Sequence, residues 1–167
     1  GDGTFQSAVS YAAAVIPRSI RAGDFNGDGR LDLAVANESS SVSVLLGNGD
    51  GTFRAPVDYS TGASPGGLTI ADFNGDGMLD LATGNQAGNS VSILLGNGDG
   101  TFQSTVDFPG IPYATNVVIG DFNGDGRMDL VVSNDNVSIL LQPTPYVATV
   151  QQPINADGSS VFNAKRG

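Results

Sequence analysis

Apolar and polar residues alternate in short runs along most of the chain, and segments rich in Gly, Asp and Asn separate these runs. The apolar stretch 42–46 is bounded by polar residues and turn signals, as a strand is, and the corresponding stretch 91–95 repeats it. No segment of 10–12 residues shows the period of an amphipathic helix, because Gly and Asp interrupt every candidate. The pattern therefore predicts an all-β chain of short strands joined by tight loops.

These runs belong to a repeat of 48–49 residues. The motif GDGTF begins at residues 1, 49 and 98, and the motif DFNGDG begins at residues 24, 72 and 121. Four antiparallel strands in a unit of this length are typical of a β-propeller blade. A β-sandwich is the alternative, but it does not require so regular a repeat. In the first complete unit we expect strands at 20–23, 31–36, 42–46 and 52–59.

The predicted architecture is three four-stranded antiparallel blades over residues 1–142. They form a partial, open arc, because a closed propeller needs four to eight blades. The remaining blades would come from a longer chain or from a second copy. A fourth GDGTF is due after Leu141, but Gln142 and Pro143 stand there instead. We expect residues 143–167 to be a linker and the truncated start of a following module, which faintly resembles an immunoglobulin-like domain.

Each repeat carries one Asp-rich loop of nine residues, first met as DFNGDGRLD at 24–32. Oxygen-bearing side chains occupy positions 1, 3, 5 and 9, and position 6 is Gly. With the main-chain carbonyl of position 7 pointing inward, this arrangement wraps a chain around a hard cation. Three carboxylates within about 4 Å repel one another by roughly 4 kcal/mol per pair at an effective dielectric constant of 20.

Turn formation alone explains the Asn-Gly and Asp-Gly steps of this loop. It does not explain three Asp residues at fixed positions in three copies. We therefore expect one Ca²⁺ in each loop, up to three in all. Mg²⁺ suits the loops less well, because it prefers fewer protein ligands and keeps more of its water.

Three other calcium-binding families share the opening of this loop but not its continuation. An EF-hand needs Glu at position 12 between two helices, whereas position 12 here is Val35, Thr83 or Val132. A dockerin-type loop also needs an acidic residue there, and calcium β-rolls repeat every nine residues. None of the three fits this chain.

Composition excludes several other functions. The chain contains no His and no Cys, so a Ser-His-Asp or Cys-His nucleophile, a His/Cys zinc site and a disulfide cannot form. The net charge of −10 argues against a nucleic-acid partner, and the apolar runs are too short for membrane insertion. Because nine of the carboxylates lie in the Asp-rich loops, we also expect the chain not to be an enzyme.

The segments DFNGDGRLDLAVAN and SVSVLLGNGDGTF closely resemble the VCBS/FG-GAP repeat, which is related to the propeller repeats of integrin α-subunits. The resemblance covers about residues 1–142. It implies propeller blades with calcium in the loop between the first two strands. It also implies side-chain ligands at loop positions 1, 3, 5 and 9 and a main-chain carbonyl at position 7. The residues at these positions are Asp24, Asn26, Asp28, Arg30 and Asp32; Asp72, Asn74, Asp76, Met78 and Asp80; and Asp121, Asn123, Asp125, Arg127 and Asp129.

The repeats differ most in the loops expected at the blade end opposite the Asp-rich loops. Variable loops on a rigid scaffold are common recognition sites, and Tyr113 and Arg18 are the side chains we single out there. We expect an extracellular or cell-surface adhesion module that binds an unknown protein or glycan ligand. The alternatives are a part of a secreted polysaccharide-degrading enzyme, catalytic or not, and a structural spacer. The variable segments are 12–19, 60–67 and 109–116, together with 38–41, 86–89 and 135–136.

Overall fold

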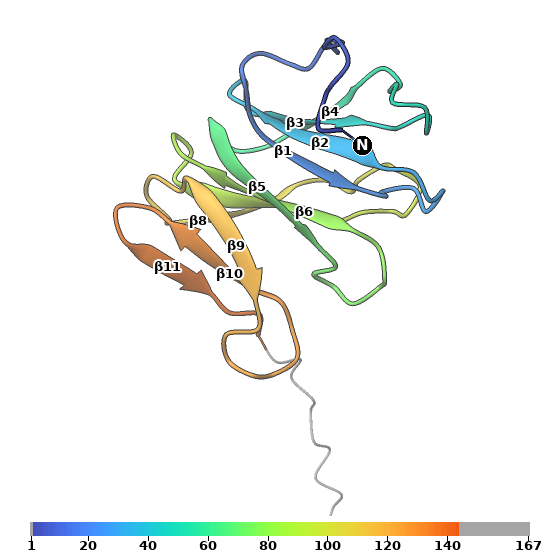
Figure 1. Ribbon diagram of the computed structural model, residues 1–167. Coiled ribbons are helices and arrows are strands. Elements are labelled where there is room, and N and C mark those ends of the chain that lie inside the picture. Colours follow the sequence, from blue (N-terminus) through green and yellow to red (C-terminus); the bar gives the residue numbers. More distant parts are fainter. Residues whose placement is uncertain (1, 144–167) are drawn as a thin grey trace, which may run out of the picture.

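The computed structural model describes residues 2–143, which form three antiparallel sheets that follow one another in chain order (Figure 1). The predicted all-β class and the open arc of propeller blades are confirmed. Of the predicted linker and following module at 143–167, all but Pro143 lies outside the described residues. The first sheet consists of β1 (Pro17–Gly23), β2 (Asp32–Asn37), β3 (Ser41–Leu45) and β4 (Val57–Ser60).

The second sheet also has four strands, but the third has three in the described residues, where the sequence predicted four. In the two complete blades the fourth strand follows a GDGTF motif, and no such motif follows β11. The second sheet consists of β5 (Pro65–Ala71), β6 (Asp80–Asn85), β7 (Ser90–Leu94) and β8 (Val106–Pro109). The third consists of β9 (Asn116–Gly120), β10 (Asp129–Ser133) and β11 (Val137–Leu140).

The last strand of each complete blade is shorter than predicted. Strand β4 begins at Val57, and only an isolated bridge between Gly47 and Phe53 pairs the preceding residues. The same bridge joins Gly96 to Phe102 in the second blade. The interruption coincides with the Phe of GDGTF, whose ring packs on the neighbouring blade in the case of Phe102.

The sheets stack face to face, with two apolar clusters between them. The first cluster, between the first and second blades, contains Phe25, Val44 and Leu81 together with Phe102. The second cluster joins the second and third blades. Strand β6 lies between both neighbours, and all six of its residues are buried. This explains why its sequence, DLATGN, lacks the alternation of a half-exposed strand.

The first strand of each blade lies next to the first strand of the following blade, β1 beside β5 and β5 beside β9 (Figure 1). A glycine permits the close approach of β5 to β9. A Cβ atom on Gly67 would lie only 2.6 Å from the Cα atom of Asn116. The blades therefore converge at their first strands, as in a propeller.

The connecting loops separate into two ends of the arc, as predicted. At one end, the β2–β3 loops bond to the segments between blades: Thr61 donates its N–H to the carbonyl of Ser40 at 3.0 Å, and Ile111 donates to that of Asn89 at 3.0 Å. At the other end, the N–H of Gly100 in a GDGTF turn bonds to the carbonyl of Phe25 in an Asp-rich loop at 3.0 Å. The variable segments thus lie opposite the Asp-rich loops.

The Asp residues of the GDGTF turns shape those turns, also as predicted. Asp50 accepts the N–H of Thr52 at 2.9 Å and its hydroxyl at 2.6 Å, which is an Asx turn. These bonds lower the pKa of Asp50.

No helix in residues 2–143 is long and apolar enough to cross a membrane.

Candidate metal centre

The Asp-rich loops connect the first and second strands of each blade and share one backbone conformation. Gly27 and Gly29, at positions 4 and 6 of the first loop, have φ values of 70° and 79°. Gly75, Gly77, Gly124 and Gly126 repeat this conformation in the other two loops. Residues other than Gly rarely adopt such φ values. The two glycines therefore allow the loop to turn twice within six residues.

The polar side chains at positions 1, 3 and 5 surround the amides of their own loop. In the first loop Asp24 accepts the N–H of Gly29 at 2.8 Å, and Asn26 accepts the N–H of Asp28 at 3.0 Å. Asp28 in turn accepts the N–H of Arg30 at 2.9 Å. The same three kinds of bond recur in the other loops. The side-chain oxygens of positions 1, 3 and 5 are therefore held around one tight turn by the loop's own N–H groups.

The Asp at position 9 has a different environment from the other acidic residues. Asp80 is fully buried at the start of β6. One of its carboxylate oxygens accepts the N–H of Phe73 in the loop, and the other accepts the N–H of Gly96 after β7, both at 2.8 Å. Asp32 and Asp129 repeat both bonds in their blades. Position 9 thus joins the loop to the third strand of its own blade.

The second loop concentrates negative charge without a cationic side chain beside it. Burial raises the pKa of Asp80, and the carboxylates of Asp76 and Asp72 raise it further, against the lowering effect of the two N–H bonds. Among the ion pairs of residues 2–143, none involves Asp72, Asp76 or Asp80. A cation bound here would relieve this repulsion.

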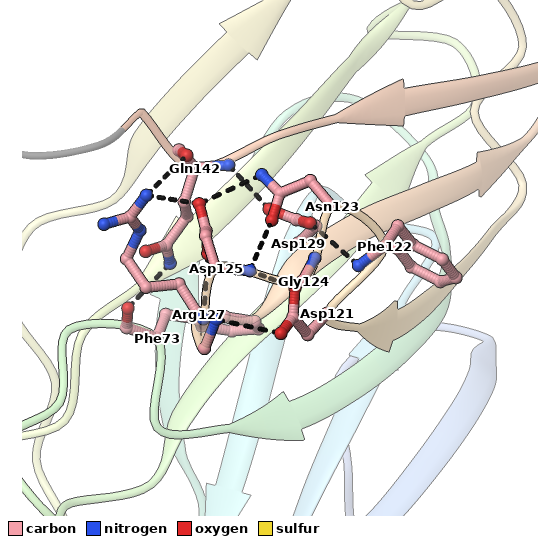
Figure 2. A network of polar contacts seen from close by, with 10 residues as sticks. Phe73, Asp121, Phe122, Asn123, Gly124, Asp125, Arg127, Asp129 and Gln142 are labelled. Atoms are coloured by element: carbon pink, nitrogen blue, oxygen red, sulfur yellow. Dashed lines mark hydrogen bonds and ion pairs between the residues drawn. The ribbon is translucent and has the colours of Figure 1, made fainter.

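The third loop differs, because an arginine neutralises part of its charge. The guanidinium of Arg127 forms an ion pair with Asp125 and also donates to the main-chain carbonyl of Gln142 at 3.4 Å (Figure 2). In the first loop the equivalent Arg30 lies 3.9 Å from Asp28, a looser contact. The three loops therefore share their backbone but not their charge balance.

The oxygen atoms that each loop offers are of the kind that binds Ca²⁺. The side chains that carry them do not converge on one point. In the described part of the chain, no three acidic side chains form a group that could hold a metal ion as they stand. Their oxygens instead accept the loop's own N–H groups. One of the four oxygen-bearing side chains in each loop is an amide, and position 7 could contribute only its main-chain carbonyl. Hard oxygen donors in a turn of this kind are those that Ca²⁺ prefers.

Sequence reasoning placed the ligand candidates in the loops but missed the second task of position 9. Its signal was present: each of these Asp residues is followed at once by Leu and is the first residue of a largely buried strand. The glycines that follow the third strand, Gly47 and Gly96, were a second signal, because a repeated glycine can mark a close approach of two backbone segments. A Cβ on Gly96 would lie 2.3 Å from the carbonyl oxygen of Leu79.

Comparison with known proteins finds the same repeat. A family model described as an FG-GAP-like repeat matches the chain twice, over residues 24–83 and 72–132. Both matches begin at the first Asp of an Asp-rich loop. No curated protein matches the chain.

Proposed function

Since these two matches span residues 24–132, the chain belongs to the FG-GAP-like repeat family, and we propose that it is a calcium-stabilised β-propeller module that binds a ligand. Calcium would bind in the Asp-rich loops, and the ligand would bind at the opposite end of the blades. The proposal rests chiefly on one observation, the uncompensated carboxylates of the second loop.

The charge of that loop supports a cation as its missing partner. Asp72, Asp76 and Asp80 lie close enough for the first two to raise the pKa of the third. The loop could have relieved this repulsion by carrying a basic residue at position 7, as the third loop does with Arg127. It has Met78 instead, whose carbonyl remains available as a ligand.

The kind of loop also suggests where the module works. Each loop offers the carboxylates of positions 1, 5 and 9, one amide and one carbonyl, and waters would complete the 6–8 oxygen ligands of Ca²⁺. Extracellular calcium modules bind at about 10⁻⁴–10⁻³ M, which exposed loops of this kind can reach without a preformed cage. We therefore propose an extracellular or cell-surface location.

The variable end of the blades is the proposed site for a protein or glycan. Tyr113 is 55% exposed there, and its backbone has a φ of 52° that a bond from its N–H to the Asn89 side chain at 3.0 Å holds in place. Arg18 forms an exposed ion pair with Glu38 at 2.6 Å. An exposed aromatic ring held by a rigid turn is a suitable binding group. Adhesion is the role we propose for this end.

Removal of calcium should lower the melting temperature of the chain. Without the ion, the carboxylates of each loop repel one another, so the calcium-bound fold is stabilised by mass action. Excess chelator should lower the melting temperature by several degrees, measured by circular dichroism. Millimolar Ca²⁺ should restore it and Mg²⁺ should not. An unchanged melting curve in chelator would contradict the calcium assignment.

A further inference from the structure

An open apolar socket lies between the second and third blades. It has a volume of about 310 Å³. The second blade lines it with Phe73, Leu95 and Phe108, and the third blade lines it with Met128, Leu130 and Leu140. Phe108 is 44% exposed at its rim. A socket of this size and composition accommodates an aromatic side chain.

The equivalent position between the first and second blades is filled by one ring. Phe102, from the GDGTF motif of the second blade, is only 7% exposed there. Its ring packs edge to face on Phe25 and Tyr59, with ring centroids 5.7 Å and 5.4 Å away. Phe25 and Tyr59 are the repeat equivalents of Phe73 and Phe108. The open socket therefore has the walls of a GDGTF site, and no GDGTF motif follows β11 to fill it.

The chain carries one further GDGTF motif, at residues 1–5, and its ring packs on no other part of residues 2–143. Phe5 is 98% exposed. Six residues later, Tyr11 packs edge to face on Phe53 of the first blade with a centroid distance of 5.3 Å, as Tyr59 packs on Phe102. Residues 2–11 are thus placed as the outer strand of a blade beside the first sheet, but the described chain has no sheet there for them to join.

We propose that the GDGTF segment of a second copy of this chain completes the third blade. Its Phe5 would enter the socket between the second and third blades. Its residues up to Tyr11 would pair with the edge of β11 that no strand within residues 2–143 covers. The chain cannot do this to itself in this structure, because its N-terminus lies against the first sheet, at the other end of the arc from β11 (Figure 1).

The edge of β11 matches the donated strand residue by residue. In the first blade, Val42 pairs with Tyr59 and Ser43 with Asp58. The same register would set Tyr11 opposite Val137, which is 68% exposed, and Val9 opposite Ile139, which is 57% exposed. In this way Phe5, Val9 and Tyr11 of one copy would cover the socket, Ile139 and Val137 of the other.

The polar part of this edge fits in the same register. Ser43 is held by Asn37 at 2.8 Å and donates to Asp58 at 2.5 Å. In the third blade, Ser138 is bonded to Asn134 at 3.0 Å, and the donated Ser10 would occupy the place of Asp58. Two copies that exchange their segments reciprocally would form a six-bladed ring, within the range of known propellers.

Sedimentation velocity of the full chain tests this proposal. We expect a species of twice the chain's mass of 16.9 kDa at micromolar concentration. Phe5→Ser should raise the dissociation constant at least about tenfold, because each copy loses one buried ring. It should leave the fold of the single chain intact, because Phe5 contacts nothing there. The matched control is Val15→Ser, which removes a 64% exposed apolar side chain outside the motif and should leave association unchanged.

A labelled peptide of residues 1–11 provides the second measurement. It should bind to the Phe5→Ser chain, whose socket stays free, and its own Phe5→Ser form should not bind. A wild-type chain that remains monomeric at about 100 µM would overturn the proposal, as would association that Phe5→Ser leaves unchanged. A peptide that does not bind would also overturn it, because the socket would then not take the GDGTF segment.

Discussion

Phe102→Ala is expected to lower the free energy of unfolding by about 3–5 kcal/mol, the usual cost of truncating a buried Phe. Phe102 is the ring that joins the first and second blades, and it contacts Phe25 and Tyr59 across that boundary. Removal of the ring leaves a cavity between two sheets, and neither sheet can move to close it without disturbing the other. Urea denaturation followed by circular dichroism measures the loss.

Phe53→Ala is the matched control for this prediction. It is the same residue in the same motif, but it is only partly buried and its aromatic neighbour is Tyr11 alone. We expect it to cost less than half as much as Phe102→Ala. Equal losses for the two variants would show that the ring does not bind the blades together.

Asp80→Ala should be comparably destabilising, by about 3–5 kcal/mol, even in the presence of chelator. The substitution leaves the buried N–H groups of Phe73 and Gly96 without acceptors, and each such group costs about 1–3 kcal/mol. It also cuts the link between the Asp-rich loop and the end of β7. Urea denaturation in chelator isolates this effect from metal binding.

Asp76→Ala, in the same loop, separates the two tasks of the carboxylates. Asp76 is exposed, and water can replace it as partner of the Met78 N–H. In chelator we expect it to cost under about 1 kcal/mol, as is usual for an exposed side chain. If Asp80→Ala proved equally mild, the buried carboxylate would have no structural role.

The sequence predicted the blades because the evidence for them is local and repeated. Short apolar runs such as 42–46 and the fixed spacing of two motifs identify the strands, their pairing and the two ends of the arc. Tertiary features were harder to predict. The burial of β6 on both faces depends on two neighbouring sheets, and the short β4 depends on where the ring of the GDGTF motif packs.

The candidate site was predictable to the level of residue and loop, but not of side-chain contact. Spacing alone places Asp72 and Asp76 in one turn with Asp80. It does not reveal that Asp80 accepts N–H groups both from the loop and from the segment after β7, because Gly96 is distant in sequence. The same holds for Arg127, because the carbonyl of Gln142 to which it also donates is distant in sequence.

Calcium stoichiometry tests the central claim most directly. Equilibrium dialysis of the full chain against Ca²⁺, with elemental analysis of the protein compartment, should give three ions per chain at saturation. Asp72→Ala should reduce the number to two, and Asp50→Ala, which alters only a GDGTF turn, should leave it at three. A chain that binds no Ca²⁺ at millimolar concentration, or a number that Asp72→Ala does not change, would contradict the account.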